Sequence, residues 1–260
     1  MKIATFNINS IRSRMDTLLT WLSEHNPDIL CLQETKVQNS EFPVQPILDA
    51  GYHVAFKGMK AYNGVAIISK KPPDEVLAGL DDGGPADEPR MIRARFGKFH
   101  VVNTYVPQGR DIEHEMFQYK IDWLRRLRGY FDRHFSREDQ VIWLGDLNVA
   151  IQPIDVYNPE ARARHVCYHV DAREAFSFCR AWGFEDVFRK YHPEGGHYTF
   201  FDYRTIDSLG KGQGWRIDYI MASPSMSSRS RNCVIDLEPR RRPKASDHTP
   251  MVATFDSDGL

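Results

Sequence analysis

The sequence has little of what marks secreted, membrane-bound or disulfide-stapled proteins. Its 260 residues include four cysteines, and none of them stands in a CxxC pair, so we expect reduced thiols and no zinc site. No apolar run approaches the roughly 20 residues of a membrane span. The segment from Met1 to Phe6 forms a strand pattern instead of a signal peptide. We therefore predict a cytoplasmic protein that has no membrane partner.

An excess of charge of one sign is also missing. The chain has 34 lysines and arginines against 35 aspartates and glutamates, which gives a net charge of −1. Proteins that coat nucleic acid without specificity are usually basic overall, so a polyanion would have to meet a local basic face. With 42% apolar and 27% charged residues, the chain is able to bury a large core. No stretch has the composition of a linker, and we predict one domain over residues 1–260.

Hydrophobic periodicity predicts an α/β chain. Apolar runs predict strands at residues 3–8, 28–32, 64–69, 91–96, 99–106, 141–144, 216–222, 233–237 and 251–255. Helical spacing predicts helices from residue 15 to the stop at Asn26-Pro27, at 117–135, and from 171 to 182. The last of these begins with a pattern typical of a capping box, Asp171 to Glu174. The simplest architecture is two mixed sheets packed face to face with helices outside.

Polar side chains fall where these apolar strands end. They are Asn7, Glu34, Asp146, Asn148, Asp218, Asp247 and His248. Each alone is ambiguous, because acids at strand ends are often only turn formers or helix caps. Strand ends in α/β layers converge on one edge, and burying an unpaired carboxylate costs several kcal/mol. Their joint occurrence therefore predicts a shared polar site.

The residue types indicate what such a site would do. Carboxylate and amide oxygens suit a hard cation such as Mg²⁺ or Mn²⁺, whereas zinc prefers cysteine and histidine pairs. A histidine beside an aspartate, with no serine or cysteine motif, fits acyl transfer poorly. Metal-assisted hydrolysis of a phosphoester fits better, because it needs a bound cation, a base for water and donors around the phosphoryl oxygens.

Seven segments, spread in order over the chain, carry a family resemblance. They are Thr5–Asn9, Leu32–Lys36, Asn103–Pro107, Gly145–Asn148, Tyr198–Arg204, Gly214–Tyr219 and Ser246–Pro250. Together they resemble the exonuclease III and apurinic/apyrimidinic (AP) endonuclease family of the endonuclease/exonuclease/phosphatase superfamily. The resemblance implies a four-layer α/β sandwich of two mixed β-sheets flanked by helices, the DNase I-like fold. It also implies a Mg²⁺-dependent DNA repair nuclease that cuts duplex DNA 5′ to abasic sites and trims 3′ ends.

The same resemblance assigns roles to the polar residues. Glu34 would be the principal Mg²⁺ ligand, with Asp247 and Asn7 beside it, and Mn²⁺ would substitute. The catalytic residues would be Tyr105, Asp146, Asn148, Asp218 and His248. Asp146 would orient or deprotonate water, Asn148 would hold the phosphate, and Tyr105 would stabilise the transition state. His248, oriented by Asp218, would donate to the phosphate; whether Asp146 or His248 is the base stays open.

Substrate choice would depend on a second set of residues. Phe200, Trp215 and Ile217 fall where the family builds a small apolar pocket for an extruded abasic sugar. In isolation such aromatic residues are more often ordinary core, by about two to one. The DNA contacts expected from the resemblance are Arg12, Arg14, Lys36, Lys120 and Arg241. The partner would be double-stranded DNA with abasic sites or 3′ ends, bound by a monomer.

The chain departs from the family pattern at three places. Ser10 stands where glycine is frequent, and Phe201 stands where tryptophan is frequent. The segment Val166–Arg173 replaces a common Gly-Phe-Thr segment, so the loop that approaches DNA is expected to differ. Two alternatives stay open: a phosphoesterase of the same superfamily acting on a non-DNA phosphoester, and a catalytically silent binding module. The pattern Gly214–Asp218, which such phosphoesterases do not share, argues against the first alternative. The complete set of acids argues against the second.

Overall fold

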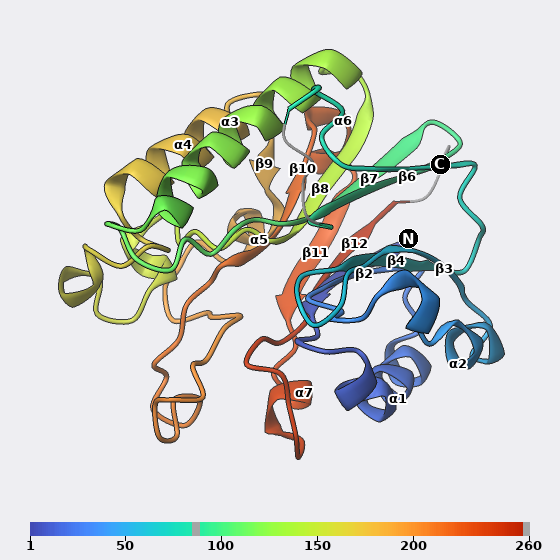
Figure 1. Cartoon of the computed structure of the whole chain (residues 1–260), viewed down its shortest axis with the longest axis horizontal. Helices are drawn as coiled ribbons and strands as arrows, with labels where there is room; N and C mark the ends of the chain where they lie inside the picture. The colour runs from blue at the N-terminus through green and yellow to red at the C-terminus, as the bar shows by residue number, and fades with distance from the viewer. Residues whose placement is uncertain (85–88, 257–260) are drawn as a thin grey trace.

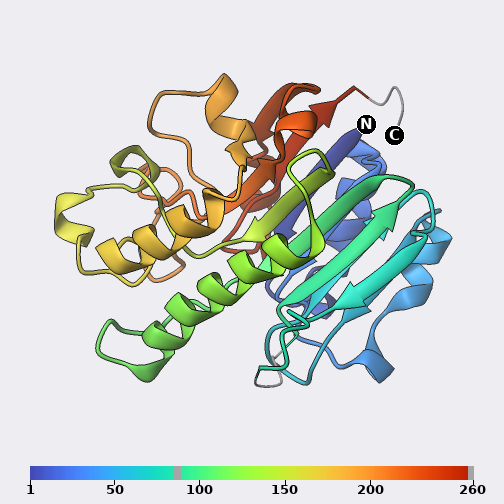
Figure 2. The same cartoon turned by 90° about the horizontal axis from the view of Figure 1, so that it is seen from above.

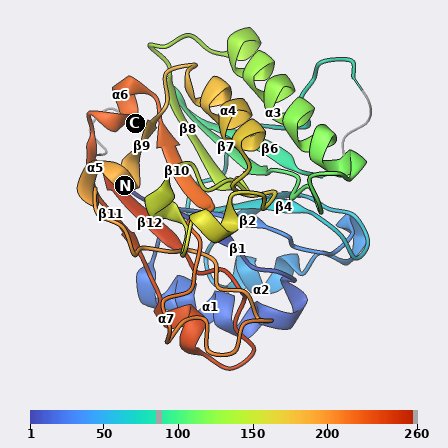
Figure 3. The ribbon, with the colours of Figure 1, turned by 90° about the vertical axis from the view of Figure 1, so that its left-hand side faces the viewer.

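Two six-stranded mixed sheets form the middle of the computed structural model, which describes residues 1–84 and 89–256. One sheet has the strand order β11-β12-β1-β2-β4-β3 and the other β5-β6-β7-β8-β10-β9. They pack face to face, with helices on both outer faces (Figures 1 and 3). This arrangement confirms the predicted four-layer α/β sandwich. No helix among the described residues is both long and apolar enough to cross a membrane.

The predicted strands of the first sheet are all present, with shifted ends. Its members are β1 (Lys2–Asn7), β2 (Ile29–Gln33), β3 (His53–Lys57), β4 (Val65–Ser69), β11 (Ser230–Ile235) and β12 (Met251–Phe255). Two helices cover its outer face, α1 (Met15–His25) and α2 (Val44–Asp49), and the short α7 (Glu238–Arg241) lies at the same side (Figures 1 and 3). The edge strand β3 is absent from the sequence predictions.

The second sheet is covered by the two longest helices of its half. Its strands are β5 (Glu75–Ala78), β6 (Met91–Phe96), β7 (Phe99–Tyr105), β8 (Gln140–Asp146), β9 (Glu185–Asp186) and β10 (Asp218–Ala222). Helices α3 (Glu115–His134) and α4 (Val170–Arg180) lie on its outer face (Figure 2). The short helices α5 (Val187–Tyr191) and α6 (Pro224–Ser227) follow β9 and β10.

Alternation along the central strands builds three apolar cores. In β8, Val141 and Trp143 pack with α3 and α4, whereas Ile142 and Leu144 pack between the two sheets. In β1, Ile3 faces the other sheet while Phe6 packs under α1. A strand buried on both faces needs an unbroken apolar run, which explains why these strands are easy to predict.

Two details of the last predicted helix differ in the structure. Helix α4 begins at Val170, and its N-cap is His169, whose ring nitrogen accepts a hydrogen bond from the Asp171 amide at 3.3 Å. Asp171 therefore lies inside the first turn instead of capping it. There its negative charge still complements the positive end of the helix dipole. The helix ends at Arg180, before the predicted Trp182.

Strand register brings the polar residues to one edge of the sandwich. β1 runs parallel to β2 and pairs Asn7 with Gln33, next to Glu34. β7 runs parallel to β8 and pairs Tyr105 with Asp146. β10 runs antiparallel to β8 and pairs Asp218 with the same Asp146. The ends of two strands from each sheet and the start of β10 thus meet.

Candidate active site

An asparagine amide joins the two sheets at this edge. The Asn7 Nδ2 group donates to Glu34 Oε1 at 2.9 Å and to Asp146 Oδ2 at 2.8 Å. Glu34 follows β2 in the first sheet and Asp146 ends β8 in the second, so one side chain fixes the spacing of two carboxylates from different layers. Glu34, Asp146 and His248 each offer a ligand atom, and these atoms lie within 4.8 Å of one another.

His248 lies between two buried aspartates. Its Nδ1 is 2.8 Å from Asp218 Oδ2, and its Nε2 is 3.7 Å from Asp146 Oδ2. All three residues are at most 4% exposed. Burial lowers the pKa of His248, but the charges of Asp218 and Asp146 outweigh this and raise the pKa. Burial, together with the Asp218 and Glu34 charges, raises the pKa of Asp146 against the opposing effect of His248.

The acidic cluster continues to Asp247 through a lysine and an asparagine. Lys36 Nζ lies 2.9 Å from Glu34 Oε2 and donates to Asn9 Oδ1 at 2.6 Å. Asn9 Nδ2 in turn donates to Asp247 Oδ1 at 2.9 Å. Burial raises the pKa of Glu34, but Lys36 and Asn7 together lower it by more. The pKa is therefore below its usual value, and the carboxylate stays ionised. This set of oxygen donors with a compensating cation beside it fits a hard divalent metal such as Mg²⁺.

The backbone around this cluster is left-handed at several residues that are not glycine. Glu34 has φ 50° and Ser10 has φ 87°, and the two are joined by a hydrogen bond of 2.7 Å from the Ser10 amide to the Glu34 carbonyl. Such conformations are costly for L-residues and concentrate at functional sites. The glycine that is frequent at the position of Ser10 therefore has a clear physical reason, and this chain forms the turn without it.

Tyr105 and Asn148 lie beside the acidic cluster at the same edge of the sandwich. Burial and the charges of Glu34 and Asp146 raise the pKa of Tyr105 well above its usual value, so its phenol remains a donor. The Asn148 amide donates to Asp146 Oδ1 at 3.0 Å, and its side-chain nitrogen donates to the Val106 carbonyl at 3.0 Å. Both side chains border the cleft described below.

Lys120 differs from what the sequence indicates. Its side chain is fully buried, and its ammonium donates to the carbonyls of Asn148 at 2.7 Å, Val166 at 2.8 Å and Gln108 at 3.2 Å. Three donors on three carbonyls leave none for a DNA phosphate. The expectation of a direct phosphate contact is therefore wrong for this residue. Lys120 holds the loop that carries Asn148 instead.

An open cleft of about 730 Å³ contains the acidic cluster and the expected sugar pocket together. Glu34, Asp146 and His248 border it beside Phe200, Trp215 and Ile217. The Phe200 ring lies 4.9 Å from the His248 ring. Backbone hydrogen bonds of 2.9 Å in both directions pair Phe200 with Trp215. The three apolar residues thus form a wall next to the reacting groups.

Sequence reasoning missed one aromatic contact in this wall. The His165 ring lies 4.5 Å from the Trp215 ring and also borders the cleft. Burial and nearby positive charges lower the pKa of His165 to about 4. His165 directly precedes Val166–Arg173, the segment that departs from the family pattern. Nothing in the local sequence distinguishes it from other loop histidines.

The other residues expected to contact DNA have different surroundings. Arg12 is exposed and pairs with Glu41 at 3.2 Å. Arg241 is exposed and pairs with Glu238. Arg14 donates to the carbonyls of Lys244 and Ala245 at 3.1 and 3.2 Å. It therefore braces the loop that leads to Asp247, and Lys36 lies inside the acidic cluster.

Comparison with known proteins gives consistent matches over nearly the whole chain. The profile of the Endonuclease/Exonuclease/phosphatase family matches residues 4–248. Exodeoxyribonuclease III of Haemophilus influenzae is 31% identical over 98% of this chain and 100% of its own length. An exodeoxyribonuclease of Bacillus subtilis is 34% identical over 96% of this chain and 98% of its own.

Solved structures agree with these sequence matches. An AP endonuclease from Archaeoglobus fulgidus is 49% identical with a TM-score of 0.96, covering 98% of this chain and 99% of that one. A 3′-5′ exonuclease from Neisseria meningitidis is 36% identical with a TM-score of 0.95, covering 98% of this chain and 100% of that one.

Proposed function

The chain belongs to the endonuclease/exonuclease/phosphatase family, and from this premise we propose that it cuts duplex DNA 5′ to abasic sites with Mg²⁺ bound at Glu34. The chain is a DNA repair nuclease, since its relatives are exodeoxyribonucleases and AP endonucleases over their whole length. One observation supports the finer proposal. A single cleft joins the acidic cluster to the wall of Phe200, Trp215 and Ile217.

Glu34 and Asp247 would hold the metal, with the Asn7 amide beside them. When bound, Mg²⁺ would neutralise negative charge on the phosphate and on the leaving oxygen. The protein's own groups would position the other participants. Because Asn7 donates to both Glu34 and Asp146, it fixes the metal ligand relative to the group that acts on water.

We propose that Asp146, and not His248, accepts the proton of the attacking water. Both ring nitrogens of His248 face aspartate oxygens, and a ring in that position serves as a donor. Asp146 is a buried carboxylate at the cleft, and a carboxylate destabilised by burial is a better base than a solvated one. His248 and Tyr105 would then donate to the phosphate and the leaving oxygen, and Asn148 would hold the phosphate.

The apolar wall would select the substrate. A nucleotide has to leave the helix to enter such a site, and the energy required is lowest where no base is stacked or paired. A bare deoxyribose would fit against Phe200, Trp215 and Ile217, next to His248. A 3′ terminus also lacks a following nucleotide, so the same site would accept it, and we propose 3′-5′ exonuclease and 3′-end-cleaning activity there. One chain supplies both the acidic cluster and the apolar wall of this cleft, so we propose that the protein acts as a monomer.

The direct test compares a duplex carrying one abasic analogue with the same duplex intact. We expect Mg²⁺-dependent cleavage 5′ to the analogue, activity with Mn²⁺ in its place, and loss of cleavage in EDTA. Equal cleavage of both duplexes would contradict the abasic specificity, and cleavage in EDTA would contradict the metal mechanism.

A pair of variants tests the role of the wall. The Phe200→Ala/Trp215→Ala double variant should lose abasic cleavage selectively while it still hydrolyses a small phosphodiester. Phe178→Ala is the matched control, because Phe178 is an aromatic residue of α4 with 52% of its surface exposed. A double variant that hydrolyses the small phosphodiester as before and loses no abasic cleavage would favour a phosphoesterase whose natural substrate is not DNA.

A further inference from the structure

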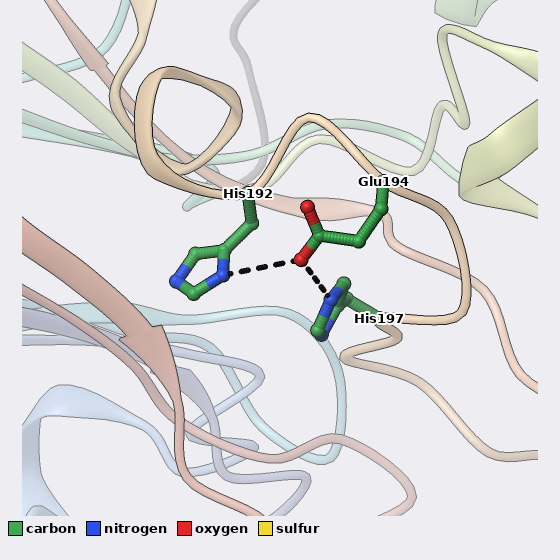
Figure 4. Close-up of side chains that lie close together, drawn as sticks. All are labelled: His192, Glu194 and His197. Carbon is green, nitrogen blue, oxygen red and sulfur yellow. Dashed lines mark hydrogen bonds and ion pairs between the residues drawn. The ribbon is translucent and has the colours of Figure 1, made fainter.

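Two histidines and a glutamate meet in the loop after α5, outside the catalytic cleft. His197 Nε2 lies 2.8 Å and His192 Nδ1 lies 3.5 Å from the same oxygen, Glu194 Oε1 (Figure 4). The three potential ligand atoms lie within 4.8 Å of one another. All three side chains are partly exposed, so one side of the cluster is open to solvent.

A hydrogen bond at its second ring nitrogen sets the orientation of His192. Its Nε2 lies 2.8 Å from the carbonyl oxygen of Cys233 in β11. A carbonyl only accepts, so Nε2 carries the hydrogen and the lone pair of the neutral ring is at Nδ1, which faces Glu194. Metal-ligating histidines commonly donate their second nitrogen to a carbonyl or carboxylate in this way.

Packing holds both rings in place. Phe188 of α5 is 1% exposed, and the His192 ring stacks on it at 4.6 Å with an interplanar angle of 23°. The His197 ring meets the same phenyl edge-on at 5.5 Å. Arg189 donates to the carbonyls of His192 and Glu194 and pairs with the buried Asp155. These contacts restrain the two rings and the backbone of the loop, which lowers the entropic cost of binding a ligand.

We propose that His192, Glu194 and His197 form a zinc site with a water in the fourth position. Two histidines and a glutamate are an established zinc ligand set. With bonds of about 2.0–2.1 Å, tetrahedral ligand atoms lie about 3.3–3.4 Å apart. The separations from Glu194 Oε1, 2.8 and 3.5 Å, reach this value by a shift of the exposed carboxylate. The cysteine spacing that predicts no zinc does not bear on a site without cysteine.

The site would connect strand β11 to the substrate wall. His192 is tied to β11 through Cys233, and His197 is followed by Tyr198, Thr199 and Phe200. The amides of Thr199 and Phe200 both donate to the Trp215 carbonyl at 2.9 Å. A metal bridging the two ends of this loop would restrain the segment that enters the wall.

The test measures zinc binding in the presence of excess Mg²⁺. The background is the full chain with Glu34→Gln, so that zinc bound at the acidic cluster is reduced and equal in all samples. We expect one equivalent of bound Zn²⁺ to disappear in His197→Ala and to remain in His53→Ala, a control at an exposed histidine of β3. Saturating zinc should also raise the Tm by roughly 5 °C in the control and not in His197→Ala.

Glu194→Gln covers the case in which removing a ring disturbs packing. The substitution keeps the size of this exposed side chain, yet we expect at least a 10- to 100-fold weaker zinc affinity. Co²⁺ should give the intense visible absorption of a tetrahedral ion in the background protein and lose it in both loop variants. Zinc stoichiometry and affinity that stay the same in His197→Ala and Glu194→Gln would overturn the proposal, as would the absence of zinc bound in the background protein.

Discussion

Asp146, the last residue of β8, lies directly opposite Asp218, the first residue of β10, in antiparallel register. Two carboxylates in this arrangement repel each other strongly in a buried site, and His248 lies against both of them. The His248 ring therefore offsets the negative charges of both aspartates, and it also borders the cleft. We therefore propose that Asp218 positions His248, although Asp218 does not border the cleft itself.

We expect Asp218→Asn to lower kcat with little change in KM. An asparagine keeps the shape but removes the charge that holds His248 as a donor, and loss of one well-placed donor costs about 10²–10³ in rate. The measurement is steady-state cleavage of an abasic duplex across pH. Asp122→Asn on the exposed face of α3 is the control. If KM rises and kcat stays unchanged, Asp218 contributes to binding and not to the orientation of His248.

Lys120→Met should destabilise the fold by about 3 kcal/mol or more. The substitution leaves the carbonyls of Gln108, Asn148 and Val166 buried without their shared donor, and each unsatisfied group costs about 1–3 kcal/mol. Chemical denaturation measures this loss. Arg125→Met, which changes an exposed cation of the same helix, is the matched control. A stable Lys120→Met variant with a weaker salt dependence of DNA binding would contradict this prediction and support a direct contact between Lys120 and a DNA phosphate.

Lys120 also shows where sequence prediction stops. Its place in a helix with an apolar face gives no sign of burial, because its three partners come from residues 108, 148 and 166, which only the fold brings together. The acidic cluster was predictable for the opposite reason: its members stand at strand ends, and parallel strands align their ends. The edge strand β5 was missed because three of its four residues are exposed, so no apolar run marks it.

The low pKa of His165 predicts a loss of stability at mildly acidic pH. The folded pKa of about 4 lies below the usual value of 6.5, so the unfolded chain binds the proton more readily. The stability that the neutral, buried His165 ring contributes is fully present above pH 6.5 and is lost as the pH falls toward 4. After allowance for solvent around the ring, we expect a loss of about 1 kcal/mol by pH 5. His165→Phe, which keeps a ring against Trp215, should lack this loss in denaturation curves at pH 5 and 7. An NMR titration of His165 with a midpoint near 6.5 would contradict the assignment.

Ser10→Gly should stabilise the protein by about 0.5–1 kcal/mol and leave cleavage unchanged. A glycine adopts the φ of 87° without the steric cost that serine bears, which outweighs its larger entropy in the unfolded chain. Ser13→Gly is an informative control, because it breaks the same 3.0 Å contact between the two hydroxyls but has ordinary helical backbone. It should destabilise by a similar amount. Equal effects of the two substitutions would mean that the contact between the hydroxyls, and not the backbone conformation of Ser10, determines the change in stability.

Arg12 and Arg14 should respond differently, although both were expected to contact DNA. Arg12→Ala should weaken binding of all DNA sequences alike and reduce the salt slope by about 1, because its exposed guanidinium is free to leave Glu41 for a phosphate. Arg14→Ala should instead lower kcat and Tm, since Arg14 braces Lys244 and Ala245 ahead of Asp247. Binding measured at several salt concentrations, beside thermal unfolding, separates the two effects. An Arg14→Ala variant that changes only the salt slope would place its guanidinium on DNA, and the loop before Asp247 would then need another support.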